Sequence, residues 1–203
     1  MDFYHEKNIT IFNHPLIQHK ISSLRNKETG TNEFRKLVGE IATLEGFEAL
    51  SDLPTELKEV ETPIEKCMTP VLRGKKPAIV PILRAGLIFT DEAIDILPQA
   101  TIRHIGMYRD EKTLKPVWYY NKVPMEADNP EKFYIYITDP MLATGNSLLA
   151  AIELYANKGI PIKNIKCICI IAAPEGLKNI YEKYPDIEII TAAVDDHLNE
   201  KGY

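Results

Sequence analysis

The segment from Phe133 to Ser147 constrains the fold more than any other part of the chain. Its first six residues, Phe-Tyr-Ile-Tyr-Ile-Thr, are aromatic or β-branched, which is typical of a buried strand. Asp139 ends this run, and a loop of small and hydroxyl residues follows. An apolar pattern with helical spacing then begins at Leu148. A strand, a short loop and a helix in series form the repeating unit of an α/β protein.

The remaining segments continue this alternation. Helical periodicity predicts helices over residues 14–24, 32–49, 87–97 and 148–157 and from Gly176 to Tyr184, whereas apolar runs predict strands over 77–82, 100–108, 165–173 and 187–194. We therefore expect an α/β fold, with a mainly parallel, doubly wound sheet flanked by helices, in a single domain spanning residues 1–203. The proline-bearing stretch 109–121 predicts a projecting β-arm, and the segment 53–72 predicts a short strand at 57–62 and a short helix at 63–71.

Composition narrows the classes of function. The net charge is −5, which argues against a large nucleic-acid-binding surface. No apolar run approaches the roughly 20 residues of a membrane span, and the N-terminus does not resemble a signal peptide. Cys67, Cys167 and Cys169 are odd in number and have no histidine close to the latter two, so reduced thiols are expected rather than a metal site. These features predict a cytoplasmic protein without nucleic-acid or membrane partners.

The loop from Asp139 to Ser147 has the chemistry of a phosphate site. Backbone N–H groups at a helix N-terminus, together with the hydroxyls of Thr144 and Ser147, can bind a phosphate monoester, and Gly145 allows close approach of the backbone. Asp139 can accept hydrogen bonds from the hydroxyls of a sugar. The same spacing also fits an ordinary strand end followed by a helix cap, and on spacing alone that reading is slightly favoured.

Two arginines strengthen the reading as a phosphate site. Arg84 and Arg109 each follow an apolar strand directly, and ligands of parallel sheets bind beyond the carboxyl ends of the strands. That rule selects four loops, at 83–87, 108–121, 139–147 and 174–176. Two guanidinium groups close to a sugar phosphate would suit a diphosphate, because each can bind its oxygens in a bidentate manner. For either arginine alone a solvated surface residue is the favoured interpretation, and it is the two together that favour a ligand site.

The letters DPMLATGNS at 139–147 resemble the motif that binds 5-phosphoribosyl 1-diphosphate (PRPP) in phosphoribosyltransferases. The form Asp-Pro-Met-Leu-Ala-Thr-Gly is similar to the uracil phosphoribosyltransferase family in particular. Further stretches agree with that family and extend the match over nearly the whole chain: HPLIQHK at 14–20, VPILRAG at 80–86, MYRDEKTLKP at 107–116, AAPEG at 172–176 and LNEKGY at 198–203.

The resemblance implies a type I phosphoribosyltransferase fold and the conversion of uracil and PRPP to UMP and diphosphate in pyrimidine salvage. It assigns catalytic roles to Arg84, Arg109 and Asp139, the two arginines on the diphosphate and Asp139 on the ribose hydroxyls. It also implies substrate binding by the rest of the loop and by the last residue: Pro140, Met141, Leu142, Ala143, Thr144, Gly145, Asn146, Ser147 and Tyr203. Magnesium would be held mainly through PRPP, without protein ligands, and GTP is a candidate allosteric activator.

The resemblance carries three structural expectations as well. A non-proline cis peptide bond is expected in the loop around Ala85. The family usually forms dimers or higher oligomers, and the arm at 109–121 resembles the element that reaches a neighbouring subunit. A homodimer or higher homo-oligomer is therefore expected.

The sequence departs from the family pattern at two places. Asn146 stands where the family usually has a second glycine, and we expect the loop to survive because asparagine tolerates the left-handed conformation best among non-glycine residues. The family also continues beyond Lys-Gly-Tyr with a tail rich in proline and glycine that contacts uracil. This sequence ends at Tyr203, so either the tail follows in the protein or the protein lacks most of its uracil-binding segment.

Two alternatives to a uracil-salvage enzyme stay open on the sequence. One is a regulatory protein on the same fold that senses PRPP or a nucleotide with little or no catalysis. The other is a phosphoribosyltransferase for another base, which is disfavoured in the purine branch because Pro140 follows Asp139 where many relatives have two adjacent acids.

Overall fold

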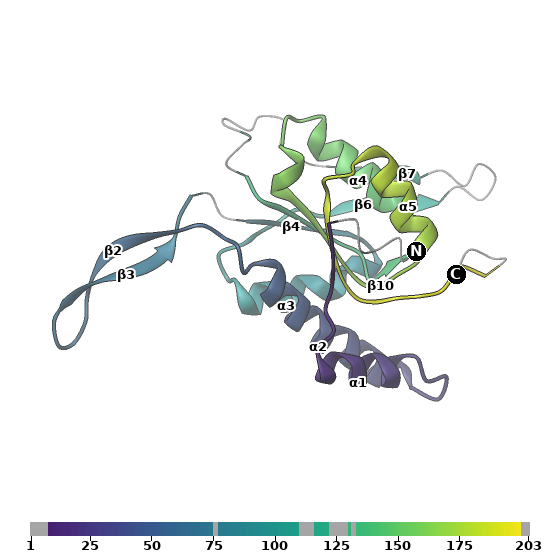
Figure 1. The fold of residues 1–203 in the computed structure, drawn as a ribbon, viewed down its shortest axis with the longest axis horizontal. Coiled ribbons are helices and arrows are strands. Elements are labelled where there is room, and N and C mark those ends of the chain that lie inside the picture. The colour runs from purple at the N-terminus through teal and green to yellow at the C-terminus, as the bar shows by residue number, and fades with distance from the viewer. Residues whose placement is uncertain (1–7, 75–76, 110–115, 122–129, 131–132, 200–203) are drawn as a thin grey trace.

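The computed structural model describes residues 8–74, 77–109, 116–121, 130 and 133–199 (Figure 1). Within these residues, nine strands form one sheet whose main path runs β1-β11-β10-β8-β4-β6-β7. The strands of this path are β1 (Ile9–Ile11), β4 (Ala78–Leu83), β6 (Ile105–Arg109), β7 (Pro116–Asn121), β8 (Ile135–Thr138), β10 (Ile165–Ala172) and β11 (Glu188–Val194). Two short strands complete it: β5 (Thr101–Ile102) pairs with β4, and β9 (Met141–Leu142) pairs with β10.

The pairings within this sheet are parallel except for the antiparallel pair β6–β7. Helices α1 (Pro15–Leu24), α2 (Thr31–Ala49) and α3 (Ile88–Ile96) cover one face, and α4 (Asn146–Ala156) and α5 (Pro174–Lys183) cover the other (Figure 1). The 3₁₀ turns η2 (Ala85–Leu87) and η4 (Ile162–Asn164) precede α3 and β10. The predicted doubly wound α/β fold is confirmed.

Strand β10 shows how the sheet separates two cores. Alternate side chains of a strand point to opposite faces. Cys167 and Cys169 accordingly lie in the core beneath α4 and α5, whereas Ile168 and Ile170 lie in the core beneath α1, α2 and α3. Both cysteines are free and buried, as the sequence predicted, and Cys67 is free as well. The nearly continuous apolar run of β10 is therefore explained by burial on both faces.

The segment 53–72 corrects one prediction. The expected strand exists as β2 (Thr55–Glu61), but residues expected to form a helix belong instead to β3 (Lys66–Leu72), which pairs antiparallel with β2. Alternating exposure along β3 is the period-two pattern of a strand, which the prolines at 63 and 70 concealed in the sequence. The β2–β3 hairpin extends away from the body of the molecule (Figure 1).

Smaller differences concern the ends of elements. Residues 100–108 form two strands, β5 and β6, rather than one. β6 and β7 form the predicted hairpin at 109–121, although its tip lies outside the described residues. β1 was not predicted, because three residues of strand are too few to show a pattern.

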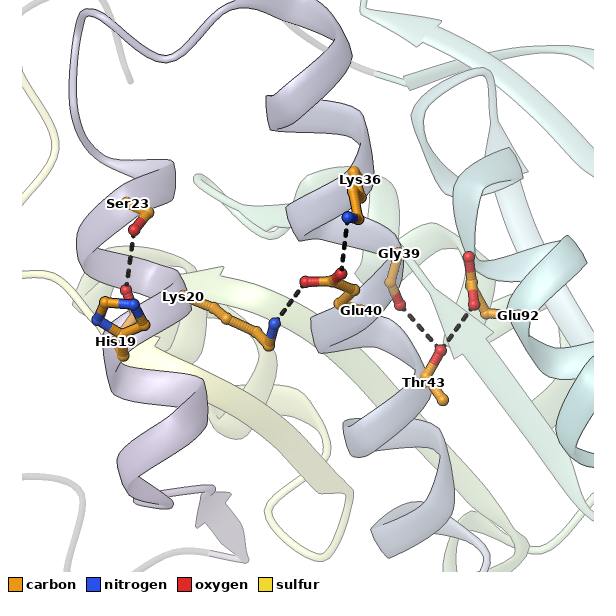
Figure 2. A network of polar contacts seen from close by, with 8 residues as sticks. All are labelled: His19, Lys20, Ser23, Lys36, Gly39, Glu40, Thr43 and Glu92. Atoms are coloured by element: carbon orange, nitrogen blue, oxygen red, sulfur yellow. Dashed lines mark hydrogen bonds and ion pairs between the residues drawn. The ribbon is translucent and has the colours of Figure 1, made fainter.

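Helices α1, α2 and α3 are joined by polar contacts (Figure 2). Lys20 of α1 forms an ion pair with Glu40 of α2, to which Lys36 is also close, at 3.8 Å. Thr43 of α2 donates from Oγ1 to Glu92 Oε2 of α3 at 2.7 Å. Helix α3 directly follows the loop that carries Arg84, so the bond between Thr43 and Glu92 holds the helix next to that loop against α2. Among the described residues, no helix is both long and apolar enough to cross a bilayer.

Candidate active site

The strand order brings the four predicted loops to one edge of the sheet. β10, β8, β4 and β6 are consecutive neighbours, and all run in the same direction. Pro81 of β4 pairs with Thr138 of β8, and Leu83 pairs with Gly106 of β6. Asp139, Arg84 and Arg109 thus lie at the carboxyl ends of three adjacent strands, as the sequence predicted, at the edge where parallel sheets bind ligands.

Main-chain hydrogen bonds hold the first half of the loop 139–147 against β10. The N–H of Asp139 donates to Ile168 O at 3.1 Å, and Pro140 O accepts from the N–H of Ile170 at 3.0 Å. Leu142 O accepts from the N–H of Ala173 at 2.8 Å, and Met141–Leu142 pair with β10 as strand β9. This half of the loop is therefore an extension of the sheet.

Side chains in this first half have different environments. Pro140 and Leu142 are buried, and Leu142 belongs to the core beneath α4 and α5. Met141 is 42% exposed. Any contact of Leu142 with a substrate would have to come from its backbone, whereas Met141 has a side chain that can reach one.

Asp139 is electrostatically distinct. Removal of its carboxyl group from water raises its pKa to about 7, because desolvation penalises the charged form. The backbone N–H of Met141 donates to the carboxylate and opposes this shift. Sugar hydroxyls that donated to the carboxylate would favour its charged form in the same way. The carboxylate of Asp139 is thus an acceptor at a strand end whose charged form would be favoured by a bound diol.

Two glycines create the second half of the loop. Gly145 has φ of +77°, and a Cβ there would lie 2.7 Å from Gly176 O. A Cβ on Gly176, in the first turn of α5, would lie 2.2 Å from Ala143 O. Neither position admits a side chain without movement of the backbone, so the loop and the first turn of α5 pack directly on each other. Sequence reasoning quoted Gly176 within AAPEG but did not predict this contact.

The N-terminus of α4 is open to an anion. The helix begins as the N–H of Leu149 donates to Gly145 O at 2.8 Å, and the residue at the N-cap, Gly145, has no side chain to cap it. The first N–H groups of a helix lack partners within the helix and carry its partial positive charge. Thr144 and Ser147, both half-buried, flank this turn. The described geometry therefore suits a phosphate.

Asn146 occupies a different conformation from the one expected. It is the first residue of α4, and the left-handed residue of the loop is Gly145. Residues at this helix position have ordinary helical angles, which any residue can adopt. The tolerance of asparagine for the left-handed region is therefore not the reason that the loop accommodates Asn146.

Asn179 of α5 is a further residue of the loop region that sequence reasoning missed. Its Nδ2 lies 3.0 Å from Thr144 O and 3.0 Å from Asn146 Oδ1. Asparagine in a helix interior is a weak signal, since it merely has low helix propensity. Its contact with the loop depends on the packing of α5 beside α4.

Arg84 lies at the mouth of this edge. Its side chain is exposed, and the peptide bond between Leu83 and Arg84 is a non-proline cis bond, just before the Ala85 position where one was expected. A Cβ on Gly86 would lie 2.6 Å from Thr138 O, so the Arg84 loop packs against the end of β8. Arg109 ends β6, but its side chain and all of Tyr203 lie outside the described residues.

Comparison with known proteins identifies the family. The model of the family described as uracil phosphoribosyltransferase matches residues 11–203. The chain belongs to the uracil phosphoribosyltransferase family. It is 52% identical to the protein of that name from Streptococcus pneumoniae over 96% of this chain and 91% of the relative, and 53% identical to that from Lysinibacillus sphaericus over the same shares.

Solved structures agree with this family at the level of the fold. The AQ2163 protein from Aquifex aeolicus superposes with a TM-score of 0.86 and 38% identity, covering 96% of this chain and 91% of that one. The adenine phosphoribosyltransferase from Leishmania donovani superposes with a TM-score of 0.56 and 15% identity, covering 100% and 89%. The second likeness concerns the fold alone, and together they place this family member among proteins with the phosphoribosyltransferase fold.

Proposed function

We propose that this member of the uracil phosphoribosyltransferase family is a pentosyltransferase that converts uracil and PRPP to UMP and diphosphate in pyrimidine salvage. One observation carries the proposal: Asp139, Arg84 and the uncapped N-terminus of α4 lie together beyond adjacent parallel strands, in a chain about half identical to enzymes of that name. An acid for a diol and a helix N-terminus for a phosphate are the two groups that a ribose 5-phosphate requires.

The phosphate end of PRPP is assigned to the second half of the loop. The 5-phosphate would accept from the N–H groups that open α4 and from the hydroxyls of Thr144 and Ser147. The ribose hydroxyls would donate to Asp139, which must be ionised to accept both. Pro140, Met141, Leu142, Ala143 and Gly145 would shape the loop by their backbone, held by β10 and by the first turn of α5.

The reaction breaks the bond between the anomeric carbon and the diphosphate oxygen and forms a bond from that carbon to a ring nitrogen of uracil, which loses its proton. Negative charge then accumulates on the departing diphosphate. Arg84 and Arg109, from the ends of neighbouring strands, are assigned to stabilise that charge. The resemblance assigns the exclusion of water to the arm at 109–121 and a place in the substrate site to Tyr203, but residues 110–115 of the arm and Tyr203 lie outside the described residues. We assign no side chain as a general base.

Magnesium is part of the proposal as a companion of PRPP. The residues described include no cluster of three or more histidine, cysteine, aspartate or glutamate side chains able to hold a metal ion. The ion would arrive on the diphosphate and keep several water ligands, as magnesium usually does. Once bound, the ion would neutralise charge on the diphosphate. GTP activation is a further proposal, tested by adding GTP to the same assay.

A homo-oligomer is also proposed. The β2–β3 hairpin exposes large apolar side chains that a lone chain would leave in water: Leu57, Ile64, Met68 and Leu72 are 52–93% exposed. Exposed apolar clusters of this kind mark interaction surfaces. Ile64→Lys, at the 93% exposed position, is expected to shift the mass measured by light scattering toward the monomer, whereas Glu65→Lys beside it is the matched control. An unchanged mass would contradict a role for the hairpin.

The cytoplasm is the proposed location. The two buried free cysteines accord with a reducing compartment. Cell fractionation would test this.

The deciding experiment is synthesis of UMP. The purified chain is incubated with uracil, PRPP and magnesium, and UMP is separated by chromatography, with adenine, hypoxanthine and cytosine as competing bases. We expect UMP and no other nucleotide, and Arg109→Ala should lower turnover far more than thermal stability. PRPP binding without any UMP would favour the regulatory alternative, and a different nucleotide would favour a different base.

A further inference from the structure

The loop 139–147 is held in two ways. Its first half is bonded to β10 by main-chain hydrogen bonds. Its second half, from Ala143 to Asn146, has contacts of another kind: the close packing of Gly145 on Gly176, and the side chain of Asn179. Packing limits how near the loop can come to α5 but does not stop it from moving away. The side chain of Asn179 makes two hydrogen bonds that oppose such movement directly.

The chemistry of the contact fixes which atoms face each other. Thr144 O can only accept, so the atom of Asn179 that lies 3.0 Å from it must be the NH₂ group. The same NH₂ group lies 3.0 Å from the side-chain amide of Asn146, which must therefore present its oxygen. Both N–H bonds of Asn179 are then used, one on the residue before Gly145 and one on the residue after it.

This arrangement spans the turn that would bind the phosphate. Thr144 precedes the left-handed Gly145, and Asn146 is the first residue of α4, whose N–H groups are open. Asn179 therefore links the two sides of that turn. The amide of Asn146 is oriented at the same time, with its oxygen engaged and its own NH₂ group left to donate elsewhere.

We propose that Asn179 is a positioning residue for the 5-phosphate site. It hydrogen-bonds to both Thr144 and Asn146, a pair of bonds called the clasp below, and so orients the N–H groups at the start of α4 before the phosphate binds. The asparagine at 146, where the family usually has glycine, is thereby the second half of the clasp. Preset donors bind an anion without the cost of ordering them first. This inference rests on the proposed function, because it concerns the PRPP phosphate.

The test compares Asn179→Asp and Asn179→Ala with wild type. Aspartate has nearly the same shape but cannot donate, and alanine removes the side chain without adding charge. Lys178→Ala, at the exposed neighbouring position of α5, is the matched control. KM for PRPP, KM for uracil, kcat, Tm and the Kd for ribose 5-phosphate by calorimetry are measured for each.

We expect KM for PRPP and the Kd for ribose 5-phosphate to rise about tenfold in both variants, since two hydrogen bonds of ordinary strength are lost. KM for uracil and kcat should stay within about twofold, as expected for an interaction formed equally with substrate and transition state. Values for PRPP within twofold of wild type would overturn the inference. A fall in Tm with equal changes for both substrates would overturn it too, by showing a structural role only.

A double-mutant cycle tests the pairing with Asn146. In the background of Asn146→Gly one of the two bonds is already absent, so Asn179→Ala should cost less affinity for ribose 5-phosphate than it does in wild type. Equal costs in the two backgrounds would overturn the clasp. Wild-type protein that forms no UMP and binds no ribose 5-phosphate would instead refute the proposed function itself.

Discussion

Gly176→Ala is expected to damage the phosphate site without touching a substrate. The added Cβ would lie 2.2 Å from Ala143 O and 3.1 Å from the nitrogen of Gly145. Both obstacles are backbone atoms, so no flexible side chain can yield. An ordinary contact of 3.4 Å requires the loop and α5 to separate by about 1.2 Å. The loop is bonded to β10 immediately before this point, so most of the movement must occur between residues 143 and 146.

The size of the effect follows from that displacement. Misplacement of a binding group by about 1 Å can lower the rate about 100-fold, so kcat/KM for PRPP should fall by about that factor. Overpacking of this kind costs about 1–3 kcal/mol, and each kcal/mol lowers Tm by about 2–4 °C in a chain of this size. UMP formation under varied PRPP and a thermal melt measure the two effects.

Gly30→Ala is the matched control for this prediction. Gly30 has φ of −70° and no atom within 4 Å of an added Cβ, so alanine fits there. Its cost should be small, since only the preference at a helix N-cap changes. Wild-type kinetics in Gly176→Ala would refute the view that the backbone of the loop rests on α5. A melting point near that of wild type with the expected kinetic loss would place the strain in the substrate complex alone.

Four further outcomes are expected. Asp139 has a pKa raised to about 7, so the affinity for PRPP should fall as the pH drops below 7. Asp139→Asn should weaken PRPP binding and abolish this pH dependence. An unchanged pH profile in the variant would contradict the assignment of Asp139 to the ribose hydroxyls. The same shift means that the folded chain binds more protons than the unfolded chain between about pH 4 and 7, so Asp139 should make stability decline as pH rises through that window, measured by urea titration. Lys166→Met should lower the free energy of unfolding by about 1–3 kcal/mol, because the 2.8 Å ion pair with Asp52 is lost. The value of kcat/KM should stay unchanged, because Lys166 lies at the end of β10 opposite to the candidate site, and a kinetic defect would contradict this. Thr43→Val should cost about 1 kcal/mol through the lost bond to Glu92, and a stability equal to that of wild type would show that water replaces it.

The fold was largely predictable because each central strand carries its own signal. β4, β8 and β10 are apolar on both faces, and each is followed by a loop and a helical pattern. The placement of Asp139, Arg84 and Arg109 at the carboxyl ends of adjacent strands followed from one rule about parallel sheets. For these three residues the local sequence pattern was enough to predict the position in the sheet. The pairing register of the strands did not have to be known.

Other features depend on tertiary contacts that no local pattern contains. The hairpin strand β3 was predicted as a helix, because prolines mask its alternating exposure and its pairing with β2 is not visible in the sequence. The contact of Gly176 with Ala143 O and the bonds of Asn179 exist only because α5 lies beside the loop. The sequence shows Gly176 and Asn179 within a predicted helix. Glycine and asparagine also occur in helices that have no such contact, so their presence did not predict one.

The position of β1 has a consequence for synthesis. β1 begins at Ile9 and pairs with β11, which begins only at Glu188. A ribosome delivers about 5–20 residues per second, so β1 and the helices after it emerge many seconds before their partner strand exists. Once β10 (Ile165–Ala172) has emerged, its edge stays unpaired until β11 follows, and α1 and α2 lack until then the contacts that they make with β11. The sheet of this chain is therefore completed late, and the nascent protein passes through a stage in which chaperones would find both an open strand edge and an apolar helical face.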